Sequence, residues 1–248
     1  MKHLLPILFV LGILSTASKC KNDVTPLGKI ALNFKAKFND LPLVMNQVYD
    51  YNGKKLRITK LSFYISGTKL NDDNSGISSQ ITTPTLKVDF TDLDSETKSL
   101  SGVNSQFEYF TSKYTSFSTN IGISKDINAK KPKDFESSNP LSNAGDYWDA
   151  WNSYIFTKLE GTLDKDGDGK FETGITLHTG GNEVYTPLNF TKSFSITEGV
   201  TTPLNFELNV NKLIDGIDLA TVNSTHQTGD LPTMKKFIGN FSNALILK

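Results

Sequence analysis

The sequence predicts an all-β fold, an antiparallel β-sandwich with a few short helices, and three observations favour it. Between residues 29 and 38, apolar side chains alternate with polar ones, as in a strand with one buried face: Ile30, Leu32, Phe34, Ala36 and Phe38. Short stretches of the same kind recur along the chain, separated by turn signals such as Asn52-Gly53. No low-complexity linker divides residues 28–248, so we expect a single domain there.

The remaining elements follow in chain order. After the Asn52-Gly53 turn, the apolar alternation slips in phase at Lys60-Leu61, which predicts a β-bulge in a long strand. Residues 71–84 and 125–139 are expected to be polar loops. Further strands are expected at 86–90, 106–110, 114–123, 174–180, 188–196 and 204–210. Residues 233–239 could form a short helix, and 244–247 an edge strand.

The N-terminal residues indicate export. Met1 to His3 form a basic start, and the apolar run from Leu4 to Leu14 is too short to span a bilayer, so residues 1–19 are predicted to be a signal peptide. Cys20, the only cysteine, is the expected lipid acceptor, with residues 20–27 as a lipidated tether. Lys19 departs from the small residue usual at its position. The alternative is ordinary signal cleavage that leaves Cys20 as a free thiol.

Charge and motifs exclude several function classes. Without Lys2 and Lys19 the mature chain would carry 24 basic and 26 acidic side chains, so no nucleic-acid partner is expected. A lone cysteine forms no internal disulfide. The sequence has no His-Glu-x-x-His pair, no Gly-x-Ser-x-Gly elbow and no Walker loop, so we do not expect an enzyme.

An acidic stretch predicts a calcium site. Asp164, Asp166, Asp168, Gly169 and Glu172 occupy positions 1, 3, 5, 6 and 9 of a calcium loop. Position 12 is Ile175, so the bidentate glutamate is missing and weaker affinity is expected. The candidate calcium ligands are Asp164, Asp166, Asp168, Lys170 and Glu172. The alternative is a plain Asp-Gly turn.

A second candidate site combines tryptophans and histidines. Both tryptophans, Trp148 and Trp151, lie in the stretch 143–161, and their spacing predicts a helical turn that shares one side with Tyr154. Packing into the core is the alternative for these indoles. His178 lies beside glycines at a strand end, open to a ligand, although a strand histidine is often only structural. His226 is the other mature histidine and is expected in a loop.

These residues resemble a known family. The stretch Gly145-Asp-Tyr-Trp-Asp-Ala-Trp-Asn-Ser-Tyr-Ile-Phe-Thr-Lys-Leu-Glu-Gly161, followed by Leu177-His-Thr-Gly180, resembles the MbnP-like family of secreted copper-binding proteins, commonly lipoproteins in Bacteroidetes. Residues 28–34, 61–66 and 117–123 also resemble the N-terminal half of that family. The resemblance implies a β-sandwich that binds copper through histidines outside the cytoplasm. In some members a partner di-haem peroxidase oxidises a tryptophan to kynurenine.

The resemblance carries over to particular residues. His178 matches the motif histidine, and Trp148 or Trp151 matches the tryptophan region. Asp146 stands where the family usually has a methionine-type residue, and His226 alone remains as a second histidine. Soft Cu(I) normally takes more nitrogen or sulfur ligands than His178 alone supplies.

The sequence therefore predicts an extracytoplasmic lipoprotein of the outer membrane, periplasmic or surface-exposed, that handles a metal. Copper is expected near His178, Trp148, Trp151 and His226. Expected partners are the membrane through Cys20 and a di-haem peroxidase or an outer-membrane transporter. The alternative function is a non-enzymatic cell-surface module that binds glycan or protein and contains a structural calcium loop.

Overall fold

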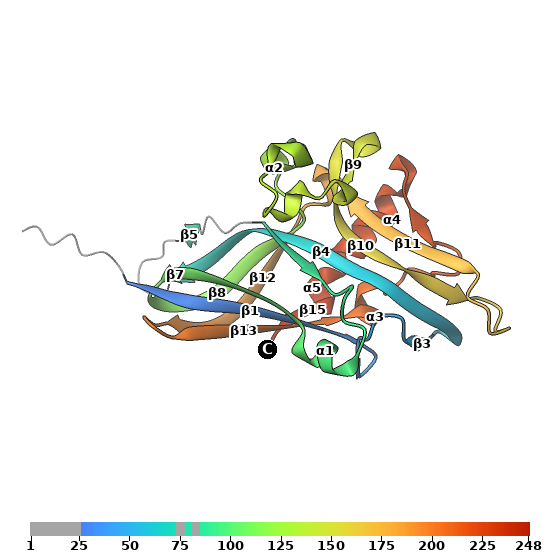
Figure 1. Cartoon of the computed structure of the whole chain (residues 1–248), viewed down its shortest axis with the longest axis horizontal. Coiled ribbons are helices and arrows are strands. Elements are labelled where there is room, and N and C mark those ends of the chain that lie inside the picture. Colours follow the sequence, from blue (N-terminus) through green and yellow to red (C-terminus); the bar gives the residue numbers. More distant parts are fainter. Residues whose placement is uncertain (1–25, 73–77, 81–84) are drawn as a thin grey trace, which may run out of the picture.

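The described strands form two β-sheets that pack face to face (Figure 1), in a computed structural model that describes residues 26–72, 78–80 and 85–248. One sheet has five strands and the other ten. The predicted all-β sandwich with short helices is confirmed. The predicted signal peptide (1–19) and most of the predicted tether, including Cys20, lie outside the described residues.

The smaller sheet has the strand order β15-β13-β1-β2, and β7 also pairs with β1. Its strands are β1 (Leu27–Phe38), β2 (Leu41–Pro42), β7 (Val103–Phe110), β13 (Thr201–Asn209) and β15 (Leu245–Leu247). β1 runs parallel to β13, from Lys29 opposite Thr201 to Lys37 opposite Asn209, and the other pairings are antiparallel. The antiparallel character expected from the sequence therefore holds for most pairs only, since β11 and β14 of the larger sheet are also parallel.

The larger sheet has the strand order β12-β8-β4-β10-β11-β14, with β3, β5 and β6 on β4 and β9 on β10. Its strands are β3 (Val48–Tyr51), β4 (Lys54–Asp72), β5 (Ser78–Gln80), β6 (Leu86–Asp89), β8 (Ser112–Ile121), β9 (Tyr147–Trp148), β10 (Ser153–Asp164), β11 (Thr173–Gly180), β12 (Thr186–Ile196) and β14 (Ser224–Thr225). β5 lies in a range expected to be loop, because it pairs with the end of β4. Its neighbours 73–77 and 81–84 are not among the described residues.

The predicted bulge lies in β4. Opposite β10, the register moves from Glu160 facing Lys60 to Gly161 facing Ile58, so Thr59 is the extra residue. The phase slip in the sequence is thereby confirmed, one residue before the expected dipeptide. A side chain at position 161 could not fit, since its Cβ would lie 2.2 Å from the Arg57 carbonyl oxygen.

The core lies between the two sheets. The alternating residues of β1 predicted to face inward are all buried: Ile30, Leu32, Phe34, Ala36 and Phe38. Phe34 of β1 meets Phe63 of β4 with ring centroids 6.1 Å apart. Phe206 of β13 meets Phe117 of β8 at 5.4 Å. These aromatic contacts belong to one hydrophobic core that both sheets share.

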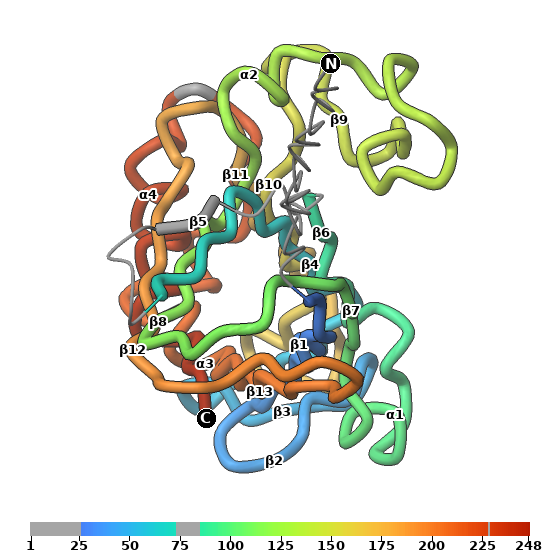
Figure 2. The backbone as a smooth tube through the Cα atoms, turned by 90° about the vertical axis from the view of Figure 1, so that its left-hand side faces the viewer, coloured from blue at the N-terminus to red at the C-terminus, as the bar shows by residue number. Residues whose placement is uncertain are grey.

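The helices are short. The α-helices are α1 (Glu96–Ser101), α2 (Lys125–Asn128), α3 (Val210–Leu213), α4 (Leu231–Gly239) and α5 (Phe241–Ala244), and the 3-10 helices are η1 (Pro132–Asp134), η2 (Pro140–Ser142), η3 (Ala144–Asp146), η4 (Asp149–Trp151), η5 (Asn182–Val184) and η6 (Thr228–Asp230). Among them, none has the length and apolar character to cross a membrane. Residues 125–139, expected to be loop, contain α2 and η1. Figure 2 shows the chain around α2 and β9 as an extension beyond the sheets.

Candidate metal centre

His178 and His226 meet at one end of β11. His178 lies two residues before the end of β11, and His226 directly follows β14, which pairs with β11 in parallel. Nδ1 of His178 and Nε2 of His226 are 3.0 Å apart. Thr225 fixes this arrangement, because its hydroxyl donates to the His178 carbonyl at 2.6 Å and accepts from the His178 amide at 2.8 Å.

Polar groups orient both rings. Nε2 of His178 lies 2.9 Å from a carboxylate oxygen of Glu160, which also pairs with Lys60 at 3.3 Å. An ionised carboxylate only accepts hydrogen bonds, so Nε2 of His178 carries the hydrogen and the Nδ1 lone pair faces His226. Nδ1 of His226 lies 3.2 Å from the Ser224 hydroxyl.

Burial keeps His178 neutral. Only 8 % of this residue is exposed, and burial lowers its pKa to about 4, against the opposing effect of the Glu160 hydrogen bond. The contact between them is therefore a hydrogen bond from a neutral imidazole to a carboxylate at neutral pH. Burial alone would raise the pKa of Glu160, but His178 and Lys60 together hold it below its ordinary value. A neutral imidazole backed by a carboxylate is the form in which histidine binds metals.

The tryptophans border this pair. The Trp148 ring meets the His226 ring edge to face, with centroids 4.7 Å apart and an interplanar angle of 90°. The rings of Trp148 and Trp151 lie against each other with centroids 3.9 Å apart and their planes tilted by 40°. Both indoles are half-buried, and Trp151 packs against the core. The sequence-predicted residues His178, His226, Trp148 and Trp151 therefore form one cluster.

The expected grouping of Tyr154 with the tryptophans is wrong. The turn exists as η4, but Asn152 adopts a left-handed conformation (φ 51°) that reverses the chain, and β9 then pairs with β10. Tyr147 faces Tyr154 in this pairing, and their rings lie 5.0 Å apart on the buried side. Trp148, the next residue, points to the opposite face of the strand.

A buried ion-pair network anchors the tryptophan segment to the sheet. The Asp146 carboxylate, in a residue that is 2 % exposed, accepts from Lys158 at 2.6 Å, Lys87 at 2.9 Å and the Tyr64 hydroxyl at 2.9 Å. Burial would raise the pKa of Asp146, but the two ammonium groups outweigh it and hold the pKa below its ordinary value. These contacts of Asp146 hold η3 against β4, β6 and β10. The sequence contained one signal for this network, since Lys158 is a charged residue close to the apolar Phe156 and Leu159 in the same strand.

The predicted calcium loop connects β10 and β11. Carboxylate oxygens of Asp164, Asp166, Asp168 and Glu172 all lie within 4.8 Å of one another. Asp164 is buried and accepts from the amides of Gly167 at 2.7 Å and Gly169 at 3.0 Å. The Lys170 ammonium pairs with Asp168, so the Lys170 side chain is not a cation ligand and only its carbonyl oxygen could serve.

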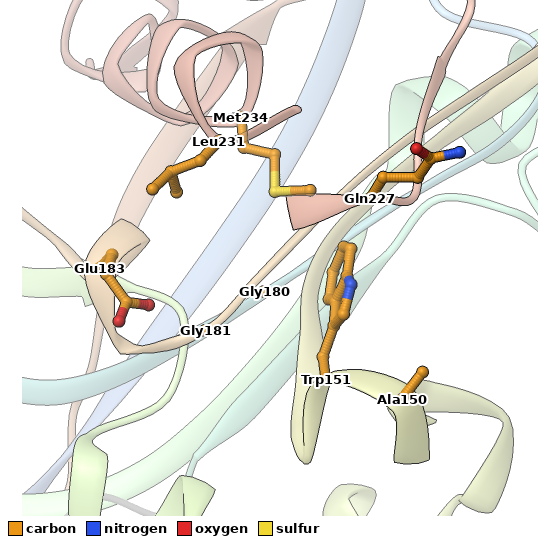
Figure 3. Close-up of a pocket in the computed structure, with 8 residues that line it drawn as sticks. All are labelled: Ala150, Trp151, Gly180, Gly181, Glu183, Gln227, Leu231 and Met234. Atoms are coloured by element: carbon orange, nitrogen blue, oxygen red, sulfur yellow. The ribbon is translucent and has the colours of Figure 1, made fainter. Parts of the chain in front are cut away.

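A cavity of about 330 Å³ opens beside Trp151. Its lining comes from four segments of the chain: Ala150, Trp151, Gly180, Gly181, Glu183, Gln227, Leu231 and Met234 (Figure 3). Figure 3 shows the Met234 side chain extending from its helix toward the side of the cavity that Trp151 forms. Gly180 is required here, because a Cβ at this position would lie 2.9 Å from the Trp151 ring.

Comparisons with known proteins agree with this architecture. A model of the MbnP family matches residues 27–228. Among solved structures, MbnP from Methylosinus trichosporium superposes with a TM-score of 0.56 at 12 % sequence identity, and the match covers 81 % of each chain. At this identity the superposition shows a shared fold. A search of curated proteins gives no match.

Proposed function

The chain belongs to the MbnP family, and we propose that it binds copper through His178 and His226 in the cell envelope. The family expected from the tryptophan stretch is thereby confirmed. One observation carries the copper proposal: the only two histidines that follow the predicted signal peptide, 48 residues apart, bring ring nitrogens within 3.0 Å. We assign the protein to metal acquisition or handling and not to catalysis.

The donor set suits copper. Imidazole nitrogen is a good ligand for copper, and Cu(I) tolerates low coordination numbers. The Glu160 carboxylate sets the Nδ1 lone pair of His178 toward His226. His226 would present Nε2 to the metal once its hydrogen moves to Nδ1, where the Ser224 oxygen can accept it. Metal–nitrogen bonds of about 2.0 Å allow ligand nitrogens up to roughly 4 Å apart, so the rings need to separate by up to about 1 Å.

Trp148 is the tryptophan that we assign to this site, because its ring contacts His226 whereas the Trp151 ring contacts Trp148 and packs against the core. If the family likeness extends to oxidation by a di-haem peroxidase, we expect Trp148 to be modified. Mass spectrometry of peptides that cover residues 144–161, from protein made in its native host, tests this. Unmodified tryptophans in that sample would remove oxidation from the proposal.

We further propose that Cys20 carries a lipid that anchors the protein in the outer membrane, where a transporter could exchange the metal. Labelling of cells with a palmitate analogue should mark the wild-type protein. The Cys20→Ser variant should carry no label.

The copper proposal is tested by metal analysis and Cu(I) titration of purified protein. We expect one copper per chain in the wild type and no stoichiometric copper in His178→Ala or His226→Ala. Asp166→Asn, in the acidic loop, is the matched control and should bind copper like the wild type. A wild-type protein that takes up no copper at neutral pH would refute the proposal and favour the interaction module. Undiminished binding in both histidine variants would refute the site.

A further inference from the structure

Three exposed apolar side chains gather where β1 begins. Leu27, Phe110 and Val200 are 46 %, 50 % and 52 % exposed, and we call them the N-terminal tip. Leu27 and Phe110 lie directly opposite each other in the β1–β7 pair. The Val200 carbonyl accepts from the Lys29 amide at 3.2 Å, two residues from Leu27. Clustered exposed apolar residues indicate a contact surface more strongly than scattered ones.

The tip begins at Leu27, close in sequence to the proposed anchor at Cys20. Cys20 precedes Leu27 by seven residues, which span at most about 25 Å when fully extended. β1 then runs for 12 residues, or about 40 Å, away from the tip to Phe38. An anchored chain therefore holds the tip close to the lipid.

We propose that the N-terminal tip rests on the lipid bilayer that holds the acyl chains of Cys20, so that the anchor and the tip together orient the domain. This inference rests on the proposed lipid anchor. Apolar side chains at a membrane interface gain free energy when they enter the boundary between headgroups and acyl chains.

Charge around the tip is balanced. Exposed Lys29 and Lys113 are offset by exposed Glu108 and Glu198. Attraction to anionic headgroups therefore does not drive the contact, and the apolar side chains do. The contact should accordingly be the same on neutral and anionic bilayers.

The orientation has a consequence for the metal centre. Figure 1 shows β9, β11 and α4, which surround the histidines, in the half of the molecule away from the start of β1. A domain that stands on its N-terminal tip keeps this half clear of the bilayer, where a protein partner can reach Trp148.

The test uses protein purified from membranes, with the state of Cys20 read by mass, in phosphatidylcholine vesicles that contain a nitroxide-labelled lipid as quencher. A fluorophore is attached at Phe110→Cys or, as reference, at Leu41→Cys, which is 56 % exposed and pairs with Phe38 at the far end of β1. We expect quenching at position 110 to exceed that at position 41 several-fold, with or without phosphatidylglycerol. Leu27→Ser should reduce the quenching at position 110, whereas the control Val48→Ser should not.

The mass of the purified protein distinguishes a failure of the tip proposal from a failure of the anchor proposal. If the mass shows acylated Cys20 and the two labels are quenched equally, the tip proposal is wrong and the anchor stands. If the mass shows Cys20 without a lipid, the anchor is wrong, and the tip proposal is overturned with it.

Discussion

Replacement of Glu160 by glutamine should weaken copper binding without unfolding the protein. The Glu160 carboxylate lies 2.9 Å from Nε2 of His178 and is the group that fixes the tautomer of this ring. Glutamine keeps the volume of the side chain but removes its charge, and its amide can donate as well as accept. His178 is then no longer held with its Nδ1 lone pair toward His226.

The expected loss of copper affinity can be given a magnitude, because Glu160 contacts the proposed ligand His178 at the ring nitrogen that does not face His226. Loss of a carboxylate that orients a ligating histidine typically costs 10- to 100-fold in metal affinity, or about 1.4 to 2.7 kcal/mol. The cost to folding should be smaller. Glu160 is 28 % exposed and Lys60 is 38 % exposed, and ion pairs that are open to solvent contribute roughly 1 kcal/mol or less.

The assay is competition for Cu(I) against a coloured chelator, with thermal unfolding measured in parallel. Glu207→Gln is the matched control. Its side chain is 26 % exposed and pairs with Lys37 at 3.0 Å and Lys248 at 3.1 Å, on the other sheet. Both variants should lose similar stability, but only Glu160→Gln should lose copper affinity. Equal copper affinities in the two variants would refute the role of Glu160.

Three further predictions concern stability. The pKa of His178 is lowered to about 4 in the folded protein, against about 6.5 in the unfolded chain. As the pH falls from 6.5 to 4, the unfolded state therefore takes up a proton on His178 before the folded state does. The free energy of unfolding of the metal-free protein should fall by roughly 3 kcal/mol over this range. Urea titrations at both pH values should show a smaller change in the free energy of unfolding for His178→Gln than for the wild type. An equal change in the two proteins would contradict this account. Calcium at about 100 times its dissociation constant should raise the Tm by roughly 5–10 °C, and EDTA or Asp166→Asn should remove the increase. A Tm indifferent to calcium would favour a plain turn. Gly122→Ala should cost roughly 2–3 kcal/mol, because φ is +102° and the new Cβ would lie 2.4 Å from the buried Phe156 ring. Gly199→Ala, with a positive φ but open space around it, should cost less in the same denaturation assay.

Features with a short sequence period were predictable. The alternation in β1 and the phase slip in β4 depend on neighbouring residues, since a strand places every second side chain on one face. The acidic loop is equally local, because its four clustered carboxylates lie within nine residues and its backbone turns at two glycines with positive φ. The expected turn at the tryptophans also formed. Its direction was not predictable, because the pairing of β9 with β10 moved Tyr154 to the other face.

The sequence by itself therefore determined the all-β class, the family resemblance and the candidate ligands. Only the tertiary structure decided that β1 pairs with β13 in parallel and that β14 places His226 beside His178. It also decided that Glu160 orients His178 and that Asp146 is bound by two lysines. Such contacts join segments far apart in the chain, and they depend on which strands pair within each sheet, which no local period of residues records.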